Sequence, residues 1–203
     1  MKIGDALSQL EERFVTSPAN YVVEAEIVFE LKHILNEQLQ PAELNGQHDS
    51  GKSRGSIPDH SEYADAIVST EEFDRVHCEV SGATFNFASE QRRLDLVIFD
   101  EEVTLSLEGG SKKFRVEDVL TAVEFKFIKN AKYLREDSKR YRLISGDIDR
   151  LDSLPEHVDT YCLIFSNFGL AQREDTRVAL ETLKSRSPRV EVRHTHPLSG
   201  SVE

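Results

Sequence analysis

RRLDLVIFD (residues 92–100) and AVEFKFIKN (residues 122–130) are the two stretches that decide the fold of this 203-residue chain. We expect them to form neighbouring β-strands. Successive side chains of a strand point to opposite faces. In the second stretch, Val123, Phe125 and Phe127 alternate with Glu124 and Lys126. One face of this strand is therefore predicted to join a core, and the other to present a carboxylate beside an ammonium.

Asp95 interrupts the first strand, which is otherwise apolar from Leu94 to Phe99. Such a run is typical of a strand that is covered on both faces. A carboxylate within it is costly unless it is paired, hydrogen-bonded or bound to a metal ion. Two explanations are open: Asp95 forms an ion pair with Lys126 or Arg93, or it belongs to a site that also contains Glu124 and Lys126.

The combination resembles the motif of the PD-(D/E)xK nuclease superfamily, in which an aspartate lies in one apolar strand and Glu-x-Lys follows in the next. Asp95, Glu124 and Lys126 are the matching residues. The chain departs from the pattern in two places. Leu94 stands where the family name has a proline, and residues 101–119 lengthen the gap between the two halves of the motif.

The resemblance implies a restriction-endonuclease-like αβββαβ core and a Mg²⁺ or Mn²⁺ ion held by Asp95, Glu124 and the backbone carbonyl of Phe125. Lys126 would orient or activate the attacking water and stabilise the transition state. The expected activity is Mg²⁺-dependent hydrolysis of phosphodiesters by a DNA endonuclease. The motif does not decide between DNA and RNA, nor between a monomer and a homodimer that cuts both strands.

A helix is predicted from Tyr21 to about Gln40, with Asn20 as its N-cap. Glu24 falls near the middle of its apolar stripe, which contains Ile27, Val28, Leu31, Ile34, Leu35 and Leu39. In the nuclease family the first core helix often adds an acidic residue to the metal site. Glu24 is the first candidate for that catalytic role and Glu26 the second. The alternative is that Glu24 sits in the first turn, where the helix dipole favours a carboxylate.

The net charge of −12 argues against a general polyanion binder. The segment Ser111–Arg142 nevertheless contains ten basic and five acidic residues, a local charge of +5. A basic flank beside acidic catalytic residues would suit a phosphodiester substrate. The candidate substrate-binding residues are Lys129, Lys132 and Arg140, with Arg150 as a further basic candidate; an ordinary charged surface is the alternative.

The rest of the chain predicts a single α/β domain over residues 1–203, with a mixed central sheet flanked by helices. Residues 41–60 are expected to be a flexible loop, and residues 101–119 a hairpin insert around Gly109-Gly110. Helices are predicted at 1–18, 61–74, 137–153 and 173–184. Further strands are predicted at 76–80, 160–167 and 189–195.

Residues 46–53 (GQHDSGKS) match the phosphate-binding loop pattern GxxxxGK[ST], with Lys52 and Ser53 as its functional residues. That pattern requires a strand directly before the first glycine and a helix directly after Lys-Ser. The flanking sequence contains prolines and glycine instead. A P-loop nucleotide-binding protein is therefore an alternative from another class, and a non-catalytic nucleic-acid-binding or interaction module with the nuclease fold is the third.

Composition fits a soluble globular protein, with 38% hydrophobic and 31% charged residues. No apolar run is long enough to span a membrane, and the first residues do not resemble a signal peptide. Cys78 and Cys162 are expected to be reduced core residues of a cytoplasmic protein. His194 and His196 form an HxH pair without nearby carboxylates, and no metal is assigned to them.

Overall fold

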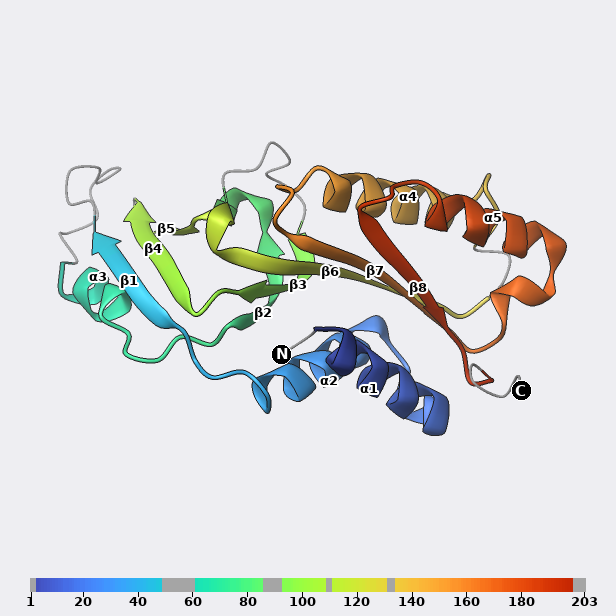
Figure 1. Cartoon of the computed structure of the whole chain (residues 1–203), viewed down its shortest axis with the longest axis horizontal. Coiled ribbons are helices and arrows are strands. Elements are labelled where there is room, and N and C mark those ends of the chain that lie inside the picture. The colour runs from blue at the N-terminus through green and yellow to red at the C-terminus, as the bar shows by residue number, and fades with distance from the viewer. Residues whose placement is uncertain (1–2, 49–60, 86–92, 109–110, 131–133, 199–203) are drawn as a thin grey trace.

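The computed structural model describes residues 3–48, 61–85, 93–108, 111–130 and 134–198 (Figure 1). The helices are α1 (Ile3–Thr16), α2 (Glu24–Asn36), α3 (Ser61–Val68), α4 (Lys139–Asp152) and α5 (Glu174–Lys184). The strands are β1 (Glu43–His48), β2 (Val76–Ser81), β3 (Arg93–Phe99), β4 (Glu102–Glu108), β5 (Ser111–Phe114), β6 (Val119–Ile128), β7 (Asp159–Ser166) and β8 (Val190–Thr195). Most of these bounds lie within two residues of the predicted ones, although α3 ends earlier than expected and α2 is shorter than expected at both ends.

The main sheet has five strands in the order β2-β3-β6-β7-β8. Strands β2, β3 and β6 pair antiparallel, whereas β6, β7 and β8 pair parallel. Helices α1 and α2 cover one face of this sheet, and α4 and α5 cover the other (Figure 1). The predicted mixed central sheet with helices on both faces is therefore confirmed.

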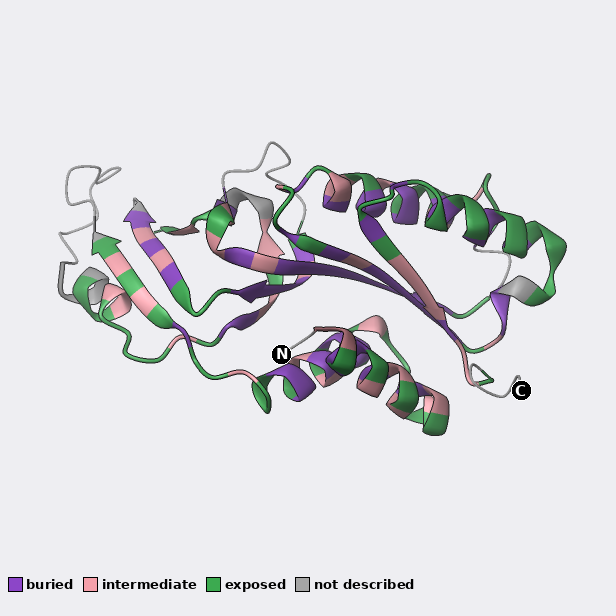
Figure 2. Ribbon diagram, viewed as in Figure 1, coloured by how far each residue is buried: buried purple, intermediate pink, exposed green. Residues whose placement is uncertain are grey.

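Strand β6 lies at the centre of the sheet and is buried along most of its length (Figure 2). Val123, Phe125 and Phe127 pack in the core beneath α1 and α2. Ala122 packs in the opposite core, beneath α4. This alternation confirms that Glu124 and Lys126 point to the α4 side. Burying each large apolar side chain of this strand stabilises the fold by roughly 1.5–3 kcal/mol, so the strand's orientation is firmly set.

A second sheet has three strands in the order β1-β4-β5. Strand β1 precedes β2 in the chain, and strands β4 and β5 follow β3. Strands β4 and β5 pair antiparallel, with Leu107 opposite Lys112, which confirms the predicted hairpin. This hairpin leaves the main sheet beyond Phe99 and before Val119, at the end of β3 that lies farther from Asp95. The insert therefore extends away from the motif residues.

Strand β1 corrects the loop predicted for residues 41–60, because Glu43–His48 pair in parallel with β4. A Cβ atom on Gly46 would lie 2.2 Å from the carbonyl oxygen of Val68 in α3, so only glycine fits this close approach. The first glycine of the GxxxxGK[ST] pattern thus lies inside a strand, whereas a phosphate-binding loop begins after one. Residues 49–60, with Lys52 and Ser53, lie outside the described residues.

The predicted start of the second helix is wrong. Pro18–Asn20 form a short 3₁₀ helix, and α2 begins only at Glu24, with Val23 as its N-cap. The reason is that the Glu26 carboxylate accepts hydrogen bonds from the backbone N–H groups of Val23, at 2.9 Å, and Val22. These bonds lower the pKa of Glu26. Glu26, the second candidate for the site, therefore caps the start of α2.

The described part of the chain has no helix that is both long and apolar enough to cross a bilayer. Both cysteines are free; Cys162 is buried in β7 and Cys78 is partly buried in β2. Burial raises the pKa of the Cys162 thiol to about 12, so this side chain behaves as an unreactive core residue.

His194 on β8 makes stability depend on pH. Its Nε2 atom lies 2.8 Å from Ser166 Oγ, whose own proton is directed to the Phe168 carbonyl. Burial is the main cause that lowers the pKa of His194 to about 4, and the neighbouring His196 and Lys184 lower it further. The unfolded chain, with a histidine pKa near 6.5, therefore binds more protons below that pH than the folded chain does.

We accordingly expect the free energy of unfolding to fall as the pH drops from about 6.5 towards 4, with His194 responsible for at most about 3 kcal/mol of the loss. Urea unfolding across this window, compared between the wild type and His194→Gln, measures that share. A variant that loses as much stability as the wild type over the same window would contradict the assignment.

Candidate active site

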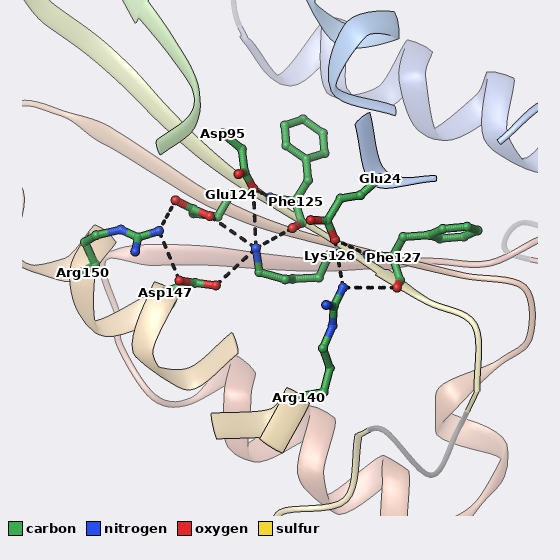
Figure 3. Close-up of polar contacts among 9 residues, drawn as sticks. All are labelled: Glu24, Asp95, Glu124, Phe125, Lys126, Phe127, Arg140, Asp147 and Arg150. Atoms are coloured by element: carbon green, nitrogen blue, oxygen red, sulfur yellow. Dashed lines mark hydrogen bonds and ion pairs between the residues drawn. The ribbon is translucent and has the colours of Figure 1, made fainter. Parts of the chain in front are cut away.

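Asp95, Glu124 and Lys126 lie together on the α4 side of the main sheet (Figure 3). Leu96 pairs with Val123, and one further step of this antiparallel register sets Asp95 opposite Glu124. Lys126 Nζ lies 3.5 Å from Asp95 Oδ2, 3.3 Å from Glu124 Oε2 and 2.6 Å from the Phe125 carbonyl oxygen. The three motif side chains and the predicted carbonyl ligand therefore meet around one point.

The ionisable side chains of Glu124 and Lys126 are almost completely buried. Glu124 is 1% exposed and Lys126 is 8% exposed. Burial, together with the Asp95 carboxylate, raises the pKa of Glu124 to about 8, although Lys126 and Arg150 act in the opposite direction. Burial lowers the pKa of Lys126, but Asp95, Glu124 and Asp147 together outweigh it and raise that pKa above its usual value. Lys126 is therefore a permanent cation at neutral pH.

Asp147 on α4 completes the cluster, and sequence reasoning missed it. Its Oδ2 lies 3.2 Å from Lys126 Nζ, and its Oδ1 lies 3.1 Å from Arg150 Nη2. Arg150 Nη2 also bonds Glu124 Oε1, which closes a ring of two carboxylates and two cations. A signal existed: Asp147 lies on the buried stripe of α4 beside Ile144 and Ile148, where a carboxylate needs partners.

Two carboxylates accept hydrogen bonds from backbone N–H groups of β6 that do not pair with β3. The backbone pairing of β6 with β3 ends at Leu96 and Val123. Farther along β6, the Phe125 N–H donates to Asp95 Oδ2 at 2.7 Å, and the Phe127 N–H donates to Glu24 Oε2 at 2.8 Å. Carboxylates thus take the place of a neighbouring strand on this edge of β6, which fixes their positions relative to Lys126.

Glu24 lies beside the cluster, and its carboxylate already has two hydrogen-bond partners. Besides the Phe127 amide, Glu24 Oε2 lies 3.0 Å from Arg140 Nη2, which is itself 3.4 Å from the Phe127 carbonyl. The predicted proximity of Glu24 and Arg140 to the motif residues is thus observed. Lys129 is exposed at the exit of β6, with Nζ 5.7 Å from the centre of the Phe127 ring. Lys132 lies outside the described residues.

The oxygen atoms around Lys126 Nζ fit a hard divalent cation. The carboxylates of Asp95, Glu124 and Asp147 and one backbone carbonyl already surround a positive charge there. Mg²⁺ is usually bound by one or two carboxylates and completes its shell with water or phosphate oxygens. The described residues contain no group of three or more His, Cys, Asp and Glu side chains placed to hold an ion. Any ion at this point would therefore need the carbonyl and solvent, and the Lys126 ammonium would have to withdraw.

The arrangement offers hard oxygen ligands, a permanent cation and a basic flank, which together suit chemistry on a phosphate ester. Its residues come from α2, β3, β6 and α4, so the whole core of the fold positions them. No protein-family model matches the chain, and searches of curated proteins and of solved structures find no match either.

Proposed function

We propose that the protein is a divalent-metal-dependent phosphodiester hydrolase of the PD-(D/E)xK type, and that it cuts DNA as an endonuclease. The observation that carries this proposal is the convergence of Asp95 Oδ2, Glu124 Oε2 and the Phe125 carbonyl at the Lys126 ammonium. The order α2, β2, β3, β6, α4, β7 also supports it, since it is the order expected of an αβββαβ core. In this assignment the second sheet is an insertion.

In the proposed mechanism, Asp95, Glu124 and the Phe125 carbonyl would hold Mg²⁺ or Mn²⁺. When bound, such an ion supplies charge neutralisation at the phosphate and lowers the pKa of a bound water. Lys126 supplies a permanent positive charge near the phosphate, where negative charge develops during the reaction. Its ammonium protons can orient the attacking water. Asp147 and Arg150 position Lys126 and Glu124 through the ring of ion pairs.

The test is cleavage of a plasmid and of a labelled DNA duplex by the wild type and by Asp95→Asn, with Mg²⁺ or Mn²⁺ and with EDTA. We expect metal-dependent cleavage by the wild type and a loss of about 10²-fold or more in Asp95→Asn. Mn²⁺ binding, measured by calorimetry, should weaken in the same variant, because one charged ligand becomes neutral. Equal cleavage rates, or cleavage that EDTA leaves unchanged, would refute the proposal.

A non-catalytic DNA-binding module is the second candidate, and one observation favours it. Lys126 and Arg150 already neutralise much of the charge on Asp95, Glu124 and Asp147, so the cluster is stable without an ion. Salt-sensitive DNA binding without metal-dependent turnover would identify this candidate.

A further inference from the structure

An open groove of about 710 Å³ runs alongside the cluster of motif residues. Glu24 and Arg140, which belong to the edge of that cluster, also line the groove. Leu143 lies one helical turn before Asp147 on α4, and Val23 directly precedes Glu24. The groove therefore begins where the proposed active site ends, and its volume is within the usual range of ligand-binding pockets, about 300–1,000 Å³.

The two sides of the groove carry exposed aliphatic side chains. Val23 is 46% exposed at the start of α2, and Leu143 is 40% exposed on α4. A second hollow of about 530 Å³ shares Phe127 and Lys129 with the first, and Val22, which is 60% exposed, lines it. The apolar lining thus continues past Lys129. Exposed aliphatic groups that share a concave lining indicate contact with an apolar ligand surface.

Positive charge accompanies this apolar lining. Lys129, Lys139 and Arg140 line the groove, and both lysines are exposed. Glu24, the one carboxylate among the described residues of the lining, is already ion-paired with Arg140. The groove therefore combines aliphatic sides with cationic side chains, which complement a ligand with both an anionic group and a flat apolar surface. An unpaired nucleotide has both, whereas the bases of a continuous duplex are stacked inside the duplex and cannot contact the sides of the groove.

We propose that this groove binds an unpaired nucleotide next to the phosphate that is cut, so that the preferred substrate is a DNA strand with unpaired bases. Lys129 and Lys139 contact its phosphates, and Val23 and Leu143 cover its base. This inference rests on the proposed function for the position of the cut, but the binding that it predicts can be measured without cleavage.

The experiment compares a continuous DNA duplex, the same duplex with a short single-stranded gap, and single-stranded DNA and RNA of the gap sequence. Binding is followed by fluorescence anisotropy in EDTA, and cleavage in Mg²⁺. The variants are Val23→Ser and Leu143→Ser. Val178→Ser is the matched control, because Val178 is an equally exposed aliphatic residue on α5, at 44%, outside the groove. Thermal unfolding checks that each variant is folded.

We expect the wild type to bind and cut the gapped duplex and single-stranded DNA better than the continuous duplex. Each groove variant should weaken that binding by about five- to tenfold, the loss expected when an aliphatic side chain no longer covers a base. Val178→Ser should bind like the wild type. Tighter binding of RNA than of DNA would overturn the assignment of DNA as the ligand of the groove.

The outcomes separate this inference from the proposed function. Groove-dependent binding of unpaired strands without metal-dependent cleavage would support the groove and refute the nuclease. Metal-dependent cleavage of the continuous duplex at an equal rate, with no effect of Leu143→Ser, would support the nuclease and overturn the groove. Absence of binding in EDTA together with absence of cleavage in Mg²⁺, for every nucleic acid, would overturn both.

Discussion

Replacing Lys126 by methionine is expected to reduce DNA cleavage by about 10²–10³-fold, the loss typical when a preorganised electrostatic group is removed from an active site. The same change should tighten Mn²⁺ binding. The reason is the position of the ammonium, which lies within 3.5 Å of carboxylate oxygens of Asp95, Glu124 and Asp147. It also lies 2.6 Å from the Phe125 carbonyl oxygen. A divalent ion must compete with this ammonium in the wild type, and methionine removes the competitor.

Calorimetry with Mn²⁺ and single-turnover cleavage measure the two effects separately. Thermal unfolding adds a third readout: Mn²⁺ should raise the unfolding temperature of Lys126→Met more than that of the wild type, since a ligand that binds more tightly stabilises the folded state more. Lys184→Met is the control, because Lys184 forms an exposed ion pair with Glu181 on α5. Unchanged turnover in Lys126→Met, or weaker Mn²⁺ binding, would contradict this account of the site.

Replacing Arg150 by methionine is expected to lower the free energy of unfolding by about 3–5 kcal/mol at pH 9, above the pKa of Glu124, because it leaves buried carboxylates without a counter-ion. Arg150 bonds both Glu124 and Asp147, and its own side chain is 13% exposed. Its Nε atom is buried without a hydrogen-bond partner in the described part of the chain, whereas its Nη2 atom contacts both carboxylates. Adding Glu124→Gln should restore much of the loss, since that change removes the uncompensated charge.

Arg186→Met provides the comparison for urea unfolding. Arg186, just beyond the end of α5, forms a two-bond ion pair with Asp149 of α4, but both side chains are substantially exposed, at 38% and 56%. An exposed pair of this kind contributes about 1 kcal/mol or less. If Arg150→Met were no more destabilising than Arg186→Met, this would contradict the prediction that the buried ion pairs of Arg150 stabilise the folded state.

The sequence was sufficient to predict the three motif residues, because their placement depends on local rules. Alternation along residues 121–128 sets the face of Glu124 and Lys126, and the apolar run around Asp95 identifies its strand. Once two such strands are neighbours, the register brings the groups together. The Phe125 carbonyl and Glu24 followed from the family resemblance, and the structure places both beside Lys126 or its strand.

The missed features depend on contacts between distant segments. Residues 43–48 are rich in polar residues and glycine, and they form β1 only because β4 offers a parallel partner more than fifty residues later. The start of α2 depends on whether Glu26 or Asn20 bonds the first amides, which local preference does not decide. Asp147 was overlooked because the motif ends at Lys126, although its position on a buried helical stripe was readable.

The carboxylates that accept hydrogen bonds from the unpaired edge of β6 can be observed by nuclear magnetic resonance. Asp95 holds the Phe125 amide and Glu24 holds the Phe127 amide, each through a single hydrogen bond. Two backbone resonances, separated by one residue, therefore report on the two acids individually. A nitrogen-15 spectrum of the intact protein can therefore follow the binding of a metal ion at each acid separately, with no substrate present.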